Sequence, residues 1–304
     1  MRALVTGASG FVGRHLLAHL DATGDEAAGI DRHTGVDVLD ADSLAKELHE
    51  ARPEVVYHLA AWSDVGGSWH APRDVFRVNA EGTLNVLLTA RDAAVERVVL
   101  VSSADVYGPV SDDELPLTEE SPFRPANPYA VSKAAADLLG LQAWIGYKLG
   151  VIRVRAFNHH GPGQSPQFVA AALAHRIARA ELTGDEVVPV GNLSARRDFT
   201  DVRDVVRAYR LLAIHGDPGE AYNVCSGITI LISEIADRLV TLARTPIRLE
   251  PDPALVRPID VPVLRGDGAK LRAVTGWAPE IPLDQTLADI LDDARRRVRN
   301  QPTT

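Results

Sequence analysis

The sequence predicts an α/β fold, in which a doubly wound parallel sheet is followed by a smaller C-terminal α/β lobe. Short runs rich in Val and Leu alternate with longer helical patterns through the first half of the chain. Within most of these runs polar residues do not alternate with apolar ones, which is typical of strands buried on both faces of a parallel sheet. A glycine-rich turn follows the first run directly. Together these observations favour repeated strand–helix units with right-handed crossovers.

The elements of the first half follow from that alternation. The apolar runs are predicted to be strands at residues 3–6, 27–31, 55–59, 98–102 and 151–156. Segments with helical periodicity lie between them, near residues 11–22, 41–51, 72–94 and 127–149. A helix therefore follows each of the first four strands and can cover one face of the sheet.

The pattern changes after residue 160, where Gly161-Pro162-Gly163 interrupts the chain. Short strands are predicted near 187–190, 221–224 and 246–250, between helices near 166–181, 202–214, 230–243 and 283–299. These pieces are too fragmented for a second large sheet. We therefore predict a cofactor-binding sheet domain over 1–160, to which segments near 197–225 and 257–265 return. An interleaved, smaller substrate-binding lobe is predicted over 161–304.

The composition of the 304 residues excludes several classes of protein. Hydrophobic residues make up 46% and charged residues 24%, which excludes extended disorder. The net charge of −9 argues against a nucleic-acid or anionic-membrane surface. No apolar run approaches the roughly 20 residues of a membrane span, and no leader peptide is recognised. The single Cys225 excludes an intrachain disulfide and indicates a reducing compartment, which we expect to be the cytoplasm.

A glycine turn marks the first candidate site. Gly7-Ala8-Ser9-Gly10-Phe11-Val12-Gly13 lies between the first predicted strand and the first predicted helix. Glycine permits a tight turn close to a pyrophosphate, and the helix N-terminus supplies N–H donors and a positive dipole end. The spacing is G-x-x-G-x-x-G, and its place in a strand–helix unit predicts dinucleotide binding in a Rossmann-type sheet.

Asp31 ends the second predicted strand, where a carboxylate usually meets the adenosine ribose. A 2′-phosphate would face its negative charge, so Asp31 favours NAD(H). Arg32 follows directly and suits that phosphate, so NADP(H) stays open. His58 begins the run His58-Leu59-Ala60-Ala61, and we expect it to be a satisfied strand-end histidine rather than a catalyst.

Tyr129 and Lys133 form the candidate catalytic pair. They lie four residues apart near the start of a predicted helix, and therefore share one face. Only four of the 32 basic residues are lysines, so a lysine at this spacing from a tyrosine is rarely expected by chance. We expect the Lys133 ammonium to lower the pKa of Tyr129, so that the phenol exchanges a proton with a substrate oxygen.

Ser103 and Asp105 follow the fourth predicted strand. The Ser103 hydroxyl can donate to the same carbonyl oxygen that Tyr129 protonates. Asp105 is a second candidate, because a carboxylate there can act as a base at carbon. Ser102 is instead expected to cap a turn.

These motifs occur in a recognisable order along the whole chain. They comprise Gly7–Gly13, Asp31, His58–Ala61, Ser103 with Tyr107-Gly108, Tyr129 with Lys133, Asn158, Gly161-Pro162-Gly163, Arg197-Asp198-Phe199 and Arg257-Pro258. The chain thereby resembles the extended short-chain dehydrogenase/reductases that act on nucleotide sugars. Residues 157–169, 191–202 and 257–262 resemble in particular the reductases of GDP-4-keto-6-deoxy-D-mannose. One departure is His160, which fills the variable position of the usual His-x-Gly-Pro-Gly wording.

The resemblance implies NAD(P)H-dependent reduction of the C4 ketone of GDP-4-keto-6-deoxy-D-mannose to GDP-6-deoxy-D-mannose (GDP-D-rhamnose), by a homodimer. It implies catalytic roles for Ser103, Tyr129, Lys133 and Asp105. It implies cofactor contacts from Gly7, Ser9, Gly10, Phe11, Val12, Gly13, Asp31, Arg32, Asp37, Val38, Leu59, Ala60, Ala61, Ser63, Asn79, Val101, Tyr129, Lys133 and Phe157. It implies substrate contacts from Ser103, Asn158, Val169, Asn192, Arg197, Arg257 and Asp260. The arginines suit a diphosphate through fork-like hydrogen bonds.

Other functions use the same residues. A nucleotide-sugar 4-epimerase would retain its NAD, whereas a reductase consumes NAD(P)H. GDP-mannose 4,6-dehydratases have Glu where Asp105 stands and Thr where Ser103 stands. An NAD(P)-sensing binding protein without chemistry typically lacks the Tyr or the Lys, and both are present here. His159 and His160 are adjacent and do not readily face one ligand, so no metal is predicted.

Overall fold

The computed structural model describes residues 1–255 and 261–300. Its main body is a six-stranded sheet with the order β2-β1-β3-β4-β5-β9, in which every neighbouring pair is parallel. The strands are β1 (Arg2–Thr6), β2 (Glu26–Ile30), β3 (Val55–His58), β4 (Arg97–Val101), β5 (Gly150–Ala156) and β9 (Ala221–Val224). The predicted α/β fold class is confirmed.

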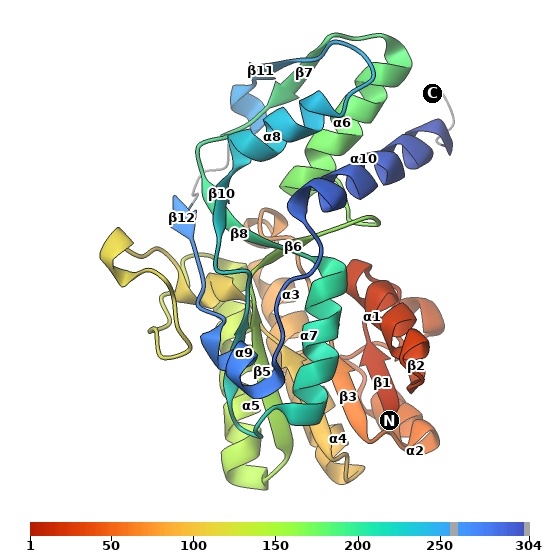
Figure 1. The fold of residues 1–304 in the computed structure, drawn as a ribbon. Coiled ribbons are helices and arrows are strands. Elements are labelled where there is room, and N and C mark those ends of the chain that lie inside the picture. The colour runs from red at the N-terminus through yellow and green to blue at the C-terminus, as the bar shows by residue number, and fades with distance from the viewer. Residues whose placement is uncertain (256–260, 301–304) are drawn as a thin grey trace.

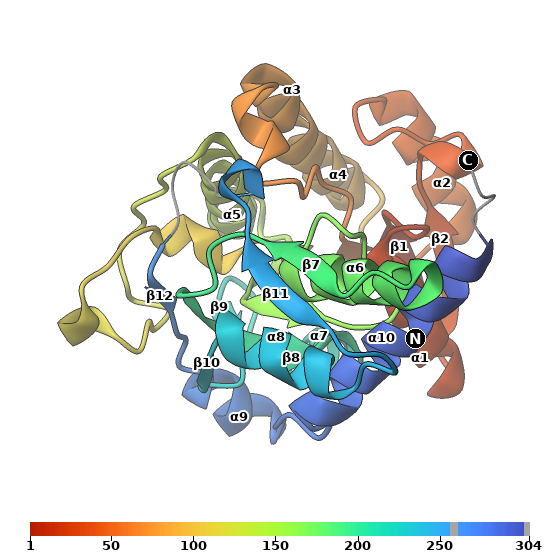
Figure 2. The ribbon, with the colours of Figure 1, turned by 90° about the horizontal axis from the view of Figure 1, so that it is seen from above.

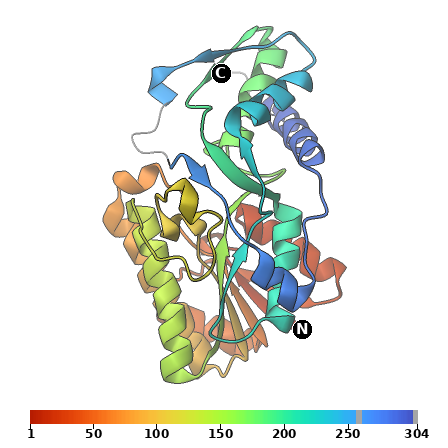
Figure 3. The same cartoon turned by 60° about the vertical axis from the view of Figure 1, so that its left-hand side comes forward.

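Helices cover both faces of this sheet, which is why its strands read as continuous apolar runs. On one face, α1 (Phe11–Ala22), α7 (Val202–His215) and α9 (Ala269–Thr275) supply Leu16, Leu20, Tyr209, Leu212 and Leu271 to a shared core. On the other, α2 (Ala41–Ala51), α4 (Gly82–Asp92) and α5 (Pro128–Tyr147) supply Leu44, Leu48, Val86, Leu87 and Ala143. Figure 3 shows α5 on one side of the sheet and α7 and α9 on the other.

The strand order reverses between β1 and β3. From β1 the chain passes outward to β2 and then crosses back to β3 on the opposite side of β1. Open α/β sheets bind ligands at such a reversal, in the crevice outside the carboxyl ends of the strands. The fold therefore places the candidate site at the upper edge of the sheet in Figure 1.

A smaller lobe lies over that edge (Figures 1 and 2). Its four-stranded sheet contains β6 (Asn158–His160), β8 (Arg196–Asp201), β10 (Thr229–Leu231) and β12 (Val263–Leu264), and a separate pair joins β7 (Val187–Val190) to β11 (Arg248–Pro251). Three helices, α6 (Val169–Thr183), α8 (Ile232–Thr241) and α10 (Leu283–Asn300), share an apolar core that includes Leu173, Ile177, Ile235, Leu287 and Leu291.

Several elements differ from the predictions. Residues 72–92 form α3 (Pro72–Phe76), a π-helical turn at Arg77–Glu81 and α4, rather than one regular helix. The strands β6, β8, β10 and β12 and the helix α9 were not predicted, because each is short or carries charged residues. The domain boundary at residue 160 stays a prediction; β9 and α7 come from the second half of the chain and pack with the large sheet. Within the described ranges, no helix is both long and apolar enough to cross a membrane.

Candidate active site

The glycine turn after β1 is built by close contacts that a side chain would prevent. Gly7 has φ of +72°, and a Cβ there would lie 2.8 Å from the Ala60 nitrogen. A Cβ on Gly13 would lie 2.3 Å from the Gly7 carbonyl oxygen. The turn therefore packs directly on the end of β3 and on the first turn of α1.

The N-terminus of α1 is open to a ligand. Gly10 is its N-cap and offers no side-chain cap, and the first turn contains no acidic residue. The leading N–H groups and the positive dipole end are thus free of the usual protein partners, an arrangement that fits a pyrophosphate. Phe11 stacks on His159 at a centroid distance of 6.2 Å, so its ring faces the lobe and its backbone, with that of Val12, faces the turn.

Asp31 joins the glycine turn to the end of β2. Its Oδ2 accepts from Ser9 N at 2.6 Å, and its Oδ1 accepts from His33 N at 2.8 Å and Thr34 N at 3.2 Å. A hydrogen bond from the Ser9 side chain, followed by these backbone hydrogen bonds, lowers the pKa of Asp31 to about 2 against the effect of burial. The carboxylate is ionised at neutral pH, and Arg32 beside it is exposed.

Asp37 and Val38 lie beyond that turn, where the chain approaches α4. Asp37 Oδ1 accepts from Leu39 N at 2.9 Å. Val38 is buried against Gly82, and its carbonyl accepts from Asn85 Nδ2 at 3.0 Å. Both residues therefore lie beside the edge formed by the carboxyl ends of the strands, which we call the cofactor edge, on the side of β2 and α4.

A buried hydrogen-bond network connects β1, β3 and α4. Thr83 Oγ1 gives its hydrogen to the Asn79 carbonyl at 2.6 Å, so His58 Nε2 must donate to Thr83 and His58 Nδ1 accepts from Thr6. Thr6 Oγ1 in turn accepts from Ala60 N at 3.1 Å. Burial lowers the pKa of His58 to about 3, with a smaller effect from Lys133. His58 is a satisfied, neutral strand-end histidine, as expected.

Asn79 holds the loop after β3 rather than presenting a free amide. Its Oδ1 accepts from Trp62 N at 2.7 Å, and its Nδ2 donates to Trp62 O at 3.1 Å and Ser132 Oγ at 2.8 Å. Leu59, Ala60 and Ala61 are half-buried at this edge, and Ser63 is exposed.

The catalytic pair lies in the first turns of α5. Asn127 caps this helix by accepting from Ala130 N at 2.8 Å, and Pro128 begins it. Tyr129 and Lys133 are both buried. Lys133 Nζ donates to the Val101 carbonyl at 2.6 Å, which ties the helix to the end of β4. The structure therefore brings three predicted residues together at one strand end.

The protonation of Tyr129 differs from the prediction. Burial raises the pKa of Tyr129, the charge of Asp105 raises it further, and a hydrogen bond with Ser103 opposes both. The expected net lowering of this pKa is therefore wrong for this arrangement, because desolvation of the phenolate is the largest effect. Burial also lowers the pKa of Lys133 to about 8, against the effect of Asp137.

Ser103 and Asp105 lie beside the phenol. Ser103 Oγ accepts from Asp105 N at 3.2 Å as it caps a short helical turn, and its hydroxyl also forms a hydrogen bond with Tyr129. Phe157 is buried in a cluster with Ala104, Ala134 and Cys225, and its contact with the cofactor stays a prediction.

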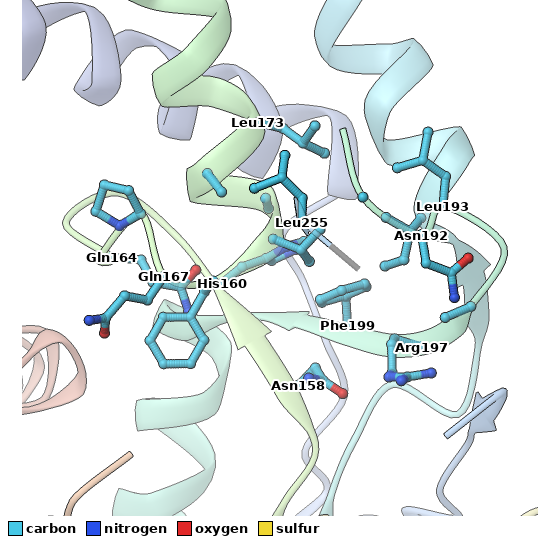
Figure 4. A pocket seen from close by; sticks show the side chains of 18 of the residues that line it. Asn158, His160, Gln164, Gln167, Leu173, Asn192, Leu193, Arg197, Phe199 and Leu255 are labelled. Carbon is cyan, nitrogen blue, oxygen red and sulfur yellow. The ribbon is translucent and has the colours of Figure 1, made fainter. Parts of the chain in front are cut away.

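A cavity of about 280 Å³ in the lobe collects the predicted substrate residues. Asn158, Val169, Asn192 and Arg197 all line it, and Figure 4 shows how three of them surround it. Arg257 and Asp260 lie outside the described residues. The side-chain atoms Asn158 Oδ1, His160 Nδ1 and Gln164 Oε1 are buried without a hydrogen-bond partner in the described part of the chain. Such atoms suit polar groups of a ligand.

Some lining residues were missed by the sequence reasoning. His160 stacks on Phe199 at 4.7 Å, and Gln164, Phe168 and Arg176 also line the cavity. Gln164 and Phe168 adjoin the Gly161-Pro162-Gly163 interruption, which was the available signal. Arg176 lies seven residues after Val169, so the two share one face of the predicted helix. Among so many arginines this spacing is only a weak signal.

No group of three or more His, Cys, Asp or Glu side chains within residues 1–255 and 261–300 is arranged to hold a metal ion.

Comparisons with known proteins agree with this geometry. Residues 3–225 match the NAD dependent epimerase/dehydratase family. The chain is 41% identical to GDP-6-deoxy-D-mannose reductase of Pseudomonas aeruginosa over 99% of both chains. It superposes on RMD from Pseudomonas aeruginosa complexed with NADPH at a TM-score of 0.90, with 39% identity and coverage of 98% of this chain and 100% of the other. It is 31% identical to UDP-glucose 4-epimerase of Mycolicibacterium smegmatis over 98% and 99% of the two chains.

Proposed function

The chain belongs to the NAD dependent epimerase/dehydratase family, and we propose that it reduces the C4 ketone of GDP-4-keto-6-deoxy-D-mannose to GDP-6-deoxy-D-mannose (GDP-D-rhamnose). The observation that carries this proposal is the 41% identity to GDP-6-deoxy-D-mannose reductase along the whole chain. The Ser103, Tyr129 and Lys133 arrangement supports it, because these groups suit proton delivery to a ketone oxygen.

The chemistry proposed for this chain's residues is proton transfer and charge stabilisation. A bound nicotinamide cofactor supplies the hydride that the C4 carbon accepts. Ser103 Oγ donates a hydrogen bond to the C4 oxygen. Tyr129 Oη gives its proton to the oxygen as negative charge develops there, and burial keeps the phenol protonated until then. The Lys133 ammonium stabilises the resulting phenolate. Asp105 lies close enough for its charge to raise the pKa of the Tyr129 phenol.

The cofactor is proposed to lie along the carboxyl edge, with its pyrophosphate at the Gly7–Gly13 turn. NADH is proposed as the preferred donor, because an ionised Asp31 would repel a 2′-phosphate. The related Pseudomonas aeruginosa structure contains NADPH, so the preference needs measurement. Asp31→Asn should raise kcat/KM for NADPH relative to NADH, and an unchanged ratio would remove Asp31 from cofactor selection.

Reduction and epimerisation make opposite demands on the cofactor. A reductase oxidises one equivalent of external NAD(P)H for each product, whereas a 4-epimerase returns the hydride and oxidises none. We expect stoichiometric cofactor oxidation with GDP-4-keto-6-deoxy-D-mannose and little cofactor retained on purification. Absence of oxidation, with tightly retained NAD, would replace the reductase by an epimerase. Conversion of GDP-mannose itself would favour the dehydratase.

A homodimer is proposed through the outer face of α5. Val131, Leu138 and Ile145 repeat at seven-residue spacing and are 44%, 54% and 60% exposed. The charged residues of α5, Lys133 and Asp137, are both buried, so this face exposes no charge. Phe76 on the adjoining α3 extends the apolar surface. An apolar stripe of this kind suits a two-fold contact with the same stripe of a second copy.

Sedimentation of Leu138→Asp tests that contact. A dimeric wild type and a monomeric variant are expected, and a variant that stays dimeric would place the interface elsewhere. The cytoplasm is proposed as the compartment, in agreement with the free, buried thiol of Cys225.

A further inference from the structure

The lobe cavity contains a charged side chain to which the proposed reaction assigns no role. Arg176 and Arg197 are the arginines among the described residues that line it, and no lysine, aspartate or glutamate lies with them there. Arg197 suits the diphosphate. Arg176 lies on α6, seven residues or about two turns beyond Val169.

Arg176 lines the cavity from α6, the helix that also supplies Leu173. Figure 4 shows Leu173 on the side of the cavity away from Asn158 and Arg197, with Leu255 between them. Arg176 follows Leu173 by three residues and so lies on the same face of α6. Its Nη1 donates to the Pro189 carbonyl on β7 at 3.1 Å, which anchors the guanidinium beside that strand.

The order of groups in a nucleotide sugar fixes which part reaches this end. The sugar must reach Tyr129 at the edge of the large sheet, and the diphosphate must follow it past Asn158 and Arg197. The base is then the group that reaches Leu173 and Leu255. Apolar side chains suit the two flat faces of a base. A cation beside those side chains can then contact the polar edge of the base.

A guanidinium recognises guanine by its acceptor pattern. Guanine presents N7 and O6 side by side as acceptors, whereas adenine presents N7 beside the N6 donor, and uracil has only O4 in a comparable position. Arginine carries five N–H donors. The contact with the Pro189 carbonyl uses one of them, so the others can donate to a base. We propose that Arg176 selects guanine by donating to O6 and N7 of the base, an inference that rests on the proposed function.

Binding of four nucleotides tests this role without requiring turnover. The full chain, saturated with oxidised cofactor, is titrated calorimetrically with GDP, IDP, ADP and UDP. IDP keeps O6 and N7 but lacks the guanine amino group. Arg176→Leu should weaken GDP and IDP by roughly tenfold to 100-fold and leave ADP and UDP within about twofold. Arg179→Leu is the matched control, because Arg179 is exposed on the same helix, and should change none of the four.

Each of the following results would overturn the inference. Equal weakening of all four nucleotides would assign Arg176 to the diphosphate, and unchanged GDP binding would remove it from the base. Arg176→Lys should retain part of the preference, and full retention would exclude a two-pronged contact. If wild type prefers GDP but Arg176→Leu keeps that preference, only the inference fails. If wild type does not prefer GDP, the GDP substrate of the proposed function fails as well.

Discussion

At the edge of the large sheet Asp31 and Asn79 are held by hydrogen bonds to the backbone, whereas three polar side-chain atoms of the lobe cavity are buried without a partner among the described residues. Asp31 accepts from three backbone N–H groups, and Asn79 bonds the backbone N–H and carbonyl of Trp62. Asn158 Oδ1, His160 Nδ1 and Gln164 Oε1 have no such partner among the described residues. The difference indicates that the chain itself fixes Asp31 and Asn79, while the lobe cavity offers polar atoms that a ligand can satisfy.

The largest expected effect falls where the two regions meet. Tyr129→Phe removes the hydroxyl proton but keeps the buried ring, so kcat should fall about 10²- to 10⁴-fold. The dissociation constant of the cofactor should stay within about threefold, because the edge that binds it is unchanged. Stopped-flow cofactor oxidation and fluorescence titration measure the two quantities. A kcat within tenfold of wild type would remove Tyr129 from proton transfer.

A side chain at the glycine turn should damage the cofactor edge alone. Gly7→Ala adds a left-handed strain of about 1–2 kcal/mol and a clash with the backbone of Ala60. Cofactor affinity should fall at least tenfold, while GDP binding persists. Gly24→Ala is the control, since Gly24 also has positive φ but nothing lies within 4 Å of its Cβ position. Equal cofactor loss in both variants would show that strain, not the packed turn, matters.

A change in the lobe should spare the cofactor. Arg197→Gln removes a charged donor from the cavity, and its KM for the nucleotide sugar should rise roughly tenfold to 100-fold. Its KM for the cofactor should not change. Arg196→Gln alters the exposed neighbour on β8 and should leave both constants near wild type. If Arg197→Gln raises the cofactor KM instead, the separation of the two regions is wrong.

The smallest effect is a pH dependence. Lys133 has a pKa of about 8, lowered by burial, so it is protonated below pH 8 and loses its charge above. The phenolate left after proton donation then loses its stabilising cation, and kcat should fall by less than about tenfold as pH rises from 8 to 9. Lys133→Arg retains its charge, so its lower kcat should lack this decline. A wild-type kcat that rises over this range would contradict the role of Lys133.

The same two regions differ in how much the sequence predicted. Strands of the large sheet were recognisable because burial on both faces makes them continuously apolar, as in β3 and β4. In the lobe, β8 contains Arg196, Arg197, Asp198 and Asp201 and reads as a polar loop. Tyr129 and Lys133 were found because a helix fixes their spacing. The raised pKa of Tyr129 was not predicted, because desolvation depends on burial in the tertiary structure, which the spacing of residues in the sequence does not show.

The central claim is that a hydride delivered at the sheet edge reaches C4 of a sugar whose nucleotide the lobe holds. NADH deuterated at the transferred position, incubated with the enzyme and GDP-4-keto-6-deoxy-D-mannose, tests it directly by NMR of the product. We expect one deuterium at C4, in GDP-6-deoxy-D-mannose with the manno configuration. Deuterium at another carbon, an unlabelled product, or the C4 epimer would contradict it.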